Sequence, residues 1–118
     1  MQSSKLLSGD YTNNSVRLWQ SVILQALLDC GNLSRSVNPS KPDWWHRQIT
    51  EEARQWFRNA DDDFEDVCAL AQLDSNLIRK FAMRVARGDA KAKKSLIEWR
   101  DWFRKLKKER VNDIRSED

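Results

Sequence analysis

The chain contains few of the residues that interrupt helices, with three glycines and two prolines among 118 residues. Much of the remainder is Ala, Leu, Arg, Lys, Glu and Gln, which favour helix. We find no internal repeat and no segment in which apolar and polar residues alternate as they do in a half-buried strand. The sequence therefore predicts an all-α protein, a compact bundle of about five helices built around one core.

Residues that carry enzymatic chemistry are also scarce. Cys30 and Cys68 form no CxxC or Cys/His cluster, and the single histidine, His46, has no ligands at metal-binding spacing and no evident nucleophile partner. The sequence has no glycine-rich phosphate loop, and the acidic run 61–63 lacks the spacing of a Ca²⁺ loop. We therefore expect no enzymatic activity, no cofactor and no metal, and two buried, reduced thiols.

Long apolar segments are missing as well. No run approaches the ~20 apolar residues that cross a bilayer. The first 15 residues are mostly polar and do not resemble a signal peptide. We expect a cytoplasmic protein with no membrane partner.

Charge is present in both signs but is unevenly distributed. The whole chain carries a net charge of +3. Residues 79–110 hold 13 Lys and Arg against four acids, a net charge of +9, whereas residues 1–78 carry −4 and residues 111–118 carry −2. This polarity indicates an anionic partner for one end of the molecule, although a solvated charged helix would show it too.

The apolar spacing predicts the order of the elements. A flexible N-terminal arm (residues 1–14) precedes a single helical domain (15–110) and a C-terminal tail (111–118). Helices are expected over 15–29, 62–71 and 75–87, and over roughly 20 residues after position 89. A further helix should end near Asn59 and begin between Asp43 and Thr50, with Thr50 favoured by the acids that follow it.

Local signals indicate where the later helices begin and end. Asp62 and Glu65 have the spacing of a capping box. Gly88 should stop one helix and Asp89 should cap the next, which is long and basic. Inward-facing aromatic residues of successive helices should form one buried cluster: Trp19, Trp56, Phe64 and Phe81.

The most informative pattern is residues 66–81, with the sequence DVCALAQLDSNLIRKF. It resembles the helix-turn-helix signature of transcription regulators: Cys68 would be the small residue where two helices cross, and Leu73 the apolar residue of the turn. Adaptor modules with a short turn between two helices also show such a pattern. Val67 and Ala71 would face inward from the first helix, and Ile78 and Phe81 from the second. One departure is Gln72, at a turn position usually occupied by Gly, where φ > 0 would cost about 1 kcal/mol.

The same register predicts a DNA-reading face. Asn pairs well with adenine and Arg with guanine. Four residues near the start of the second motif helix should therefore contact base edges in the major groove: Ser75, Asn76, Arg79 and Lys80. Amides at the start of this helix could also hold a phosphate, although the charge of Asp74 opposes one. The second group should hold phosphates beside the groove: Arg84, Lys91, Lys93 and Lys94.

Two stretches resemble small prophage-type helix-turn-helix proteins, including short regulators that activate gene-transfer-agent and late phage genes. One is residues 18–29, and the other is residues 53–57 followed by residues 63–71 and 73–74. The resemblance covers roughly residues 15–85. It implies a transcription activator or antiterminator that acts on DNA near RNA polymerase. The basic helix after Gly88 lies outside the resemblance, so its role depends on its charge alone.

The sequence thus favours a sequence-specific regulator that binds double-stranded DNA. The alternative is an interaction module that binds RNA polymerase or another protein through its acidic half and exposed tryptophans, Trp44, Trp45 or Trp102. Salt distinguishes the two, because phosphate contacts weaken steeply with salt and a tryptophan-centred interface does not.

Overall fold

A computed structural model describes the backbone of residues 2–35 and 38–117 and the side chains of residues 15–35 and 38–106. Within this part of the chain five helices and no strands are present. Their bounds are α1 (Gln2–Cys30), α2 (Asp43–Asn59), α3 (Asp62–Leu70), α4 (Ser75–Ala86) and α5 (Ala90–Glu117). The predicted all-α bundle of about five helices is confirmed.

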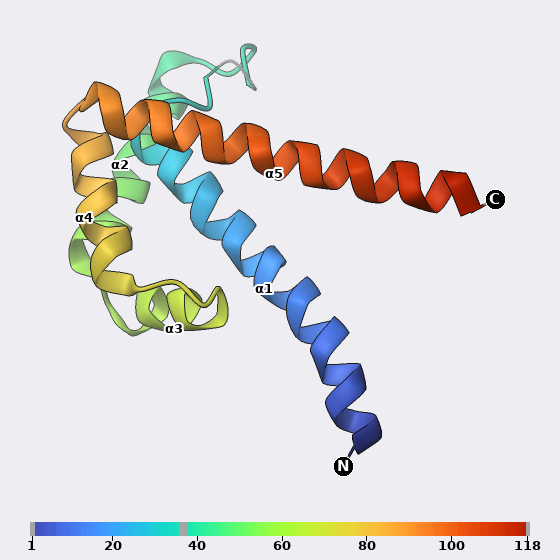
Figure 1. The fold of residues 1–118 in the computed structure, drawn as a ribbon. Coiled ribbons are helices and arrows are strands. Elements are labelled where there is room, and N and C mark those ends of the chain that lie inside the picture. The colour runs from blue at the N-terminus through green and yellow to red at the C-terminus, as the bar shows by residue number, and fades with distance from the viewer. Residues whose placement is uncertain (1, 36–37, 118) are drawn as a thin grey trace.

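Helix α1 organises the bundle, because it contacts each of the other four helices. Figure 1 shows α3 and α4 on one side of α1, while α5 and α1 diverge from a shared region toward the two chain ends. The core lies where the helices converge and takes residues from all five of them: Ile23, Leu27, Phe57, Phe64, Cys68, Val85 and Leu96 are among its most buried members.

An aromatic cluster joins α2 to α3. Phe57 and Phe64 are fully buried and pack edge to face, with ring centroids 5.7 Å apart. Trp56 lies against both rings and donates an indole hydrogen bond to Asp63 at 2.9 Å. The predicted cluster is therefore confirmed for Phe64, whereas Trp19, Trp56 and Phe81 pack on the core only partly buried.

Helix α2 begins at Asp43, the earlier of its two predicted starts, so the start at Thr50 is wrong. His46 is 4% exposed and lies on the same stripe as Ala53 and Phe57, at the i, i+7, i+11 spacing of one helix face. Burial of this stripe extends the helix toward Pro42. An ion pair of 2.7 Å between Arg35 and Asp43 lies at the helix start.

The cap of α3 differs by one residue from the prediction. Asp61, not Asp62, is the N-cap, and its carboxylate accepts a hydrogen bond from the Phe64 amide at 3.2 Å. This register buries Phe64 completely and places Asp62 and Asp63 in the first turn, where negative charge is favourable. The predicted Asp62–Glu65 capping box is therefore wrong.

The two terminal helices are longer than predicted. α1 begins at Gln2 rather than Ser15, and α5 continues to Glu117. Neither extension contains a proline, so neither has the strongest helix breaker. The side chains of residues 1–14 and 107–118 lie outside the described residues, and the predicted flexible arm and tail stay predictions.

Three helices end in the same backbone motif. After α1, α3 and α4, a residue with positive φ is followed by an amide that donates to the carbonyl five residues back: Leu33 to Leu28, Leu73 to Cys68 and Asp89 to Arg84. The residues with positive φ are Asn32 (56°), Gln72 (56°) and Gly88 (86°). These are Schellman caps. After α3 and α4 the next helix begins within a few residues, whereas residues 31–42 connect α1 to α2.

In the described helices we find none that combines the length and apolar character needed to cross a bilayer.

Candidate nucleic-acid interface

Helices α3 and α4 and the turn between them form the predicted helix-turn-helix. Val67, Cys68 and Ala71 are buried, with Cys68 at 1% exposed where the two helices meet the core. Leu73, Ile78 and Phe81 pack on the core partly buried. The inward face of the motif therefore agrees with the sequence pattern, and Ala82 and Val85 extend it as fully buried residues that the pattern had not singled out.

The turn has a residue with positive φ, Gln72, at the position where the sequence has Gln instead of the usual Gly. Gln72 has φ of 56°, in the region where a residue other than glycine costs about 1–2 kcal/mol. The Leu73 amide nevertheless donates to the Cys68 carbonyl at 2.9 Å, so the Schellman cap forms without glycine. The angle between the two motif helices is thus set by a complete hydrogen-bonded cap.

A contact from α1 supports this turn. The side-chain amide of Gln20 donates to the Ala71 carbonyl at 3.1 Å, across 51 positions of sequence. Sequence reasoning missed Gln20, since a polar residue on an otherwise apolar helix face gives no local sign of its partner. The bond fixes the motif against the central helix of the bundle.

Asp74 begins α4 as its N-cap. One carboxylate oxygen accepts from the amides of Asn76 at 2.9 Å and Leu77 at 3.2 Å. Two amides at the helix start therefore already have a partner in Asp74, which a phosphate would have to replace, and the phosphate site at these amides stays a prediction.

The four residues predicted to read bases lie in the first half of α4. Asn76, Arg79 and Lys80 are exposed, and Ser75 is partly buried at the first helical position. Arg79 is turned toward α2, where its guanidinium is 3.4 Å from the Arg58 carbonyl. Lys80 forms no ion pair with any described residue. The α4 sequence itself contains no acid.

The face of α4 also carries an apolar residue that the sequence analysis did not select. Leu77 is 64% exposed, beside Asn76 and one turn from Lys80. The register gave no clear sign of this exposure, because Leu77 lies one turn before the inward-facing Phe81, at the edge of the buried face. The exposed face is therefore polar with one aliphatic side chain near its start.

The four residues predicted to hold phosphates surround the junction of α4 and α5, at the far end of α4. The 12 residues of α4 place this junction about 18 Å from the reading end. Lys91 and Lys94 are exposed, whereas Lys93 is partly buried. At 100° per residue, Lys93 falls on the side of α5 that also carries Arg100 and Arg104, away from Lys91.

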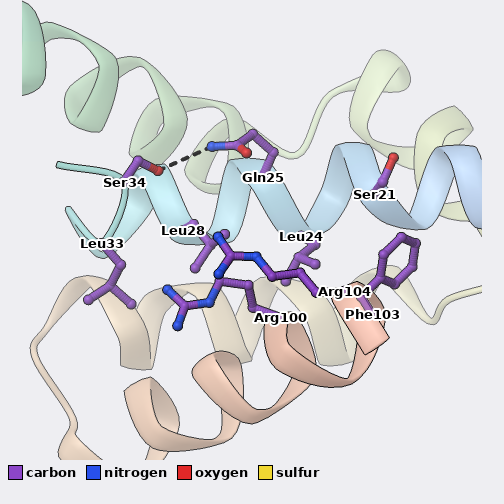
Figure 2. Close-up of a pocket in the computed structure, with 9 residues that line it drawn as sticks. All are labelled: Ser21, Leu24, Gln25, Leu28, Leu33, Ser34, Arg100, Phe103 and Arg104. Atoms are coloured by element: carbon purple, nitrogen blue, oxygen red, sulfur yellow. Dashed lines mark hydrogen bonds between the residues drawn. The ribbon is translucent and has the colours of Figure 1, made fainter. Parts of the chain in front are cut away.

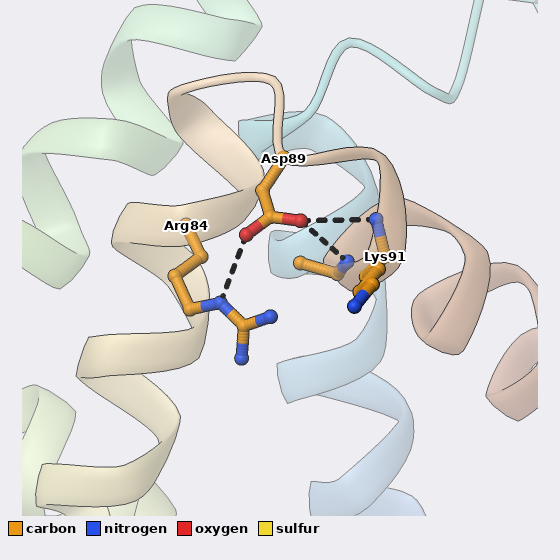
Figure 3. Close-up of polar contacts among 4 residues, drawn as sticks. Arg84, Asp89 and Lys91 are labelled. Atoms are coloured by element: carbon orange, nitrogen blue, oxygen red, sulfur yellow. Dashed lines mark hydrogen bonds and ion pairs between the residues drawn. The ribbon is translucent and has the colours of Figure 1, made fainter.

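A carboxylate clamps this junction. Asp89 caps α5, as predicted, by accepting from the Lys91 amide at 2.9 Å and the Ala92 amide at 3.2 Å. Its other oxygen pairs with the Arg84 guanidinium at 3.2 Å (Figure 3). The Ala92 amide and Arg84 hold the pKa of Asp89 below its ordinary value. Arg84 is thus oriented, and partly neutralised, by a partner that sequence reasoning did not assign to it.

Both cysteines are free and buried. Burial raises the pKa of Cys68 to about 11, with a further contribution from the nearby charges of Glu65 and Asp74. Burial also raises the pKa of Cys30, whose thiol lies 3.5 Å from the Ala82 carbonyl. Both are therefore protonated at neutral pH, as packing residues would be.

The described residues contain no group of three or more His, Cys, Asp or Glu side chains that could hold a metal ion. The buried ring of His46 packs edge to face on Trp45, at 5.2 Å between centroids.

Comparison of the chain with protein-family models, with curated proteins and with solved structures gives no match.

Proposed function

We propose that this chain is a sequence-specific DNA-binding transcription regulator, of the activator or antiterminator type, with α4 as the helix that enters the major groove. The observation that carries the proposal is the pairing of α3 and α4 through a complete cap, with an exposed, acid-free α4 face. An α-helix fits the major groove, and its N-terminal side chains reach the base edges.

The exposed residues of α4 supply the chemistry for reading. The side-chain amide of Asn76 can pair with adenine, and the guanidinium of Arg79 can pair with guanine once it leaves the Arg58 carbonyl. That contact is long, at 3.4 Å, and exposed, so its loss costs little. Lys80 and Ser75 add donors to the same end of the helix.

The second group of residues supports the proposal through charge. Lys91 and Lys94 extend from the first turns of α5, and Arg84 lies across the junction, half-exposed. Cationic side chains in this arrangement would contact the backbone phosphates and orient α4 without reading sequence. Lys93 would contribute through longer-range attraction, since it lies on another side of α5.

A binding selection on randomised duplexes tests the proposal. We expect the wild-type protein to enrich one motif, and Asn76→Ala and Arg79→Ala each to relax it at one position, with about 1–3 kcal/mol of discrimination lost. Asn76→Ala leaves the cap intact, because Asp74 accepts from the backbone amide of residue 76. Arg47→Ala is the matched control, since Arg47 is exposed at the opposite end of α2 from Arg58.

Enrichment of no motif by the wild-type protein would contradict the proposal. So would enrichment of the same motif with the same stringency by both α4 variants.

A second candidate is an interaction module that binds RNA polymerase or another protein. Two exposed tryptophans favour it: Trp44 on α2 is 60% exposed and Trp102 on α5 is 54% exposed. Trp45 is partly buried and pairs with His46, so it is a weaker anchor. Binding that persists from low to high salt and is lost in Trp102→Ala would favour this module over DNA.

A further inference from the structure

A cavity of about 190 Å³ lies between α1 and α5. It is separate from the exposed face of α4, and its walls come from α1, from the segment just after α1, and from the middle of α5 (Figure 2). Cavities of about 150 Å³ hold a benzene molecule in other proteins. The space is therefore large enough for a single aromatic ring or a body of similar size.

One part of the cavity is apolar. Leu24, Leu28 and Phe103 are each 6–7% exposed, and Leu33 is partly buried beside them. A ligand that fills this part must present an apolar surface, since a small hydrated ion would lose water there without replacement.

Another part of the cavity is cationic. Arg100 and Arg104 lie one turn apart on α5, and both line the cavity, with their guanidinium groups extending past Leu28 in Figure 2. Like charges at this spacing repel each other. Among the described residues that line the cavity, none is acidic. Within the part of the chain whose side chains are described, Arg100 forms an ion pair with its neighbour Asp101, at 3.2 Å and with the Asp101 side chain 61% exposed.

The remaining polar groups of the wall already have partners. The Ser34 hydroxyl donates to Asp29 at 2.7 Å, the Gln25 side-chain amide donates to Ser34 at 3.1 Å, and the Ser21 hydroxyl donates to the Leu18 carbonyl. The guanidinium N–H groups are thus the donors best placed to meet a ligand. They would fix its anionic end toward α5 and its apolar end toward α1.

We propose that the cavity between α1 and α5 is a binding site for a small carboxylate with a compact apolar body, held at its anionic end by Arg100 and Arg104. This site does not depend on the DNA-binding proposal. Planar guanidinium groups match carboxylate oxygens in paired hydrogen bonds, and such charge-assisted bonds are the stronger kind. The ligand would also relieve the repulsion between the two arginines.

Three probes test both halves of the site: phenylacetate, its neutral amide phenylacetamide, and acetate. Binding to the full chain is followed by amide chemical shifts in a ¹⁵N NMR titration, which locates the site as well as measuring affinity. We expect phenylacetate to shift resonances around Leu24, Leu28 and Arg104, and to bind at least tenfold more tightly than either of the other two.

Variants distinguish the contribution of the arginine charges from that of the cavity volume. Arg104→Gln should weaken phenylacetate binding about tenfold, because one charge-assisted partner is lost. Arg87→Gln, an equal charge change at the exposed residue that follows α4, should leave it unchanged. Ser21→Phe should abolish binding by filling the cavity with both arginines retained. Circular dichroism spectra and melts of each variant show that the fold persists.

Equal binding of phenylacetate and phenylacetamide would overturn the proposal, because the arginines would then not select an anion. Unchanged binding in Arg104→Gln, or shifts that map away from α1 and α5, would overturn it as well.

Discussion

The turn of the helix-turn-helix gives a stability prediction with a defined sign. Gln72 holds φ of 56° in an otherwise regular Schellman cap. Releasing an L-residue from this region gains about 1–2 kcal/mol. Glycine lowers the free energy of unfolding by about 0.5–1 kcal/mol, because it gives the unfolded chain more conformational freedom. We therefore expect Gln72→Gly to raise the free energy of unfolding by roughly 0.5–1 kcal/mol, or a few degrees in Tm.

The other caps provide internal controls for Gln72→Gly. Gln72→Ala removes the same exposed side chain but keeps the strain, so it should match the wild type. Asn32→Gly should stabilise less, because Asn tolerates positive φ better than Gln does. Gly88→Ala should destabilise by about 1 kcal/mol through strain alone, since a Cβ at Gly88 would meet no atom within 4 Å.

Urea denaturation followed by circular dichroism measures all four variants under one condition, with equal slopes indicating an unchanged unfolded state. If Gln72→Gly and Gln72→Ala have the same midpoint, backbone strain at the turn is not the cause of any change. A Gln72→Gly variant less stable than wild type would refute the reasoning altogether.

Three further predictions concern Gly31, Asp89 and Leu77. Gly31→Ala should destabilise by about 1–3 kcal/mol in a thermal melt, because its Cβ would lie 2.6 Å from Val85 Cγ1, and Val85→Ala in the same chain should relieve part of the loss. Folding lowers the pKa of Asp89, so its contribution to the free energy of unfolding is present above the ordinary aspartate pKa of about 4 and is lost as the pH falls below it. The free energy of unfolding of Asp89→Asn should therefore fall less steeply with acid than that of the wild type, and parallel curves would contradict this. The exposed Leu77 should contact a thymine methyl group, so replacing thymine by uracil at one position of a selected site should weaken wild-type binding about fourfold in a fluorescence titration. The same replacement should not change the binding of Leu77→Ala. If no such replacement weakens wild-type binding, Leu77 does not read bases.

The sequence predicted most of this fold because its signals are local. The end of α4 before Gly88 and the cap of α5 at Asp89 depend on residues a few positions apart. The same is true of the inward-facing residues between Val67 and Phe81, and the structure contains all of these features. The errors occur where several residues offer the same local chemistry. Any of the three consecutive aspartates 61–63 could cap α3, and only the burial of Phe64 selects Asp61.

Features of the candidate site that depend on distant residues could not be predicted. Gln20 supports the turn at Ala71 across 51 positions, and Arg79 reaches Arg58 on another helix. The cavity between α1 and α5 likewise requires knowing how the two helices pack. The position of Lys93 is a different case, because the helical register alone separates it from Lys91 and the sequence grouping by charge overlooked this.

The central position of α1 has a consequence for how the molecule loses its structure. Since every other helix packs on α1, none can detach without exposing part of the apolar surface around Ile23 and Leu27. Amide hydrogens of that segment should exchange with solvent only when the whole domain opens, so they report its global stability. The two-helix motif is accordingly not a module that would keep its orientation in isolation, because that orientation depends on a helix that ends some thirty residues before it.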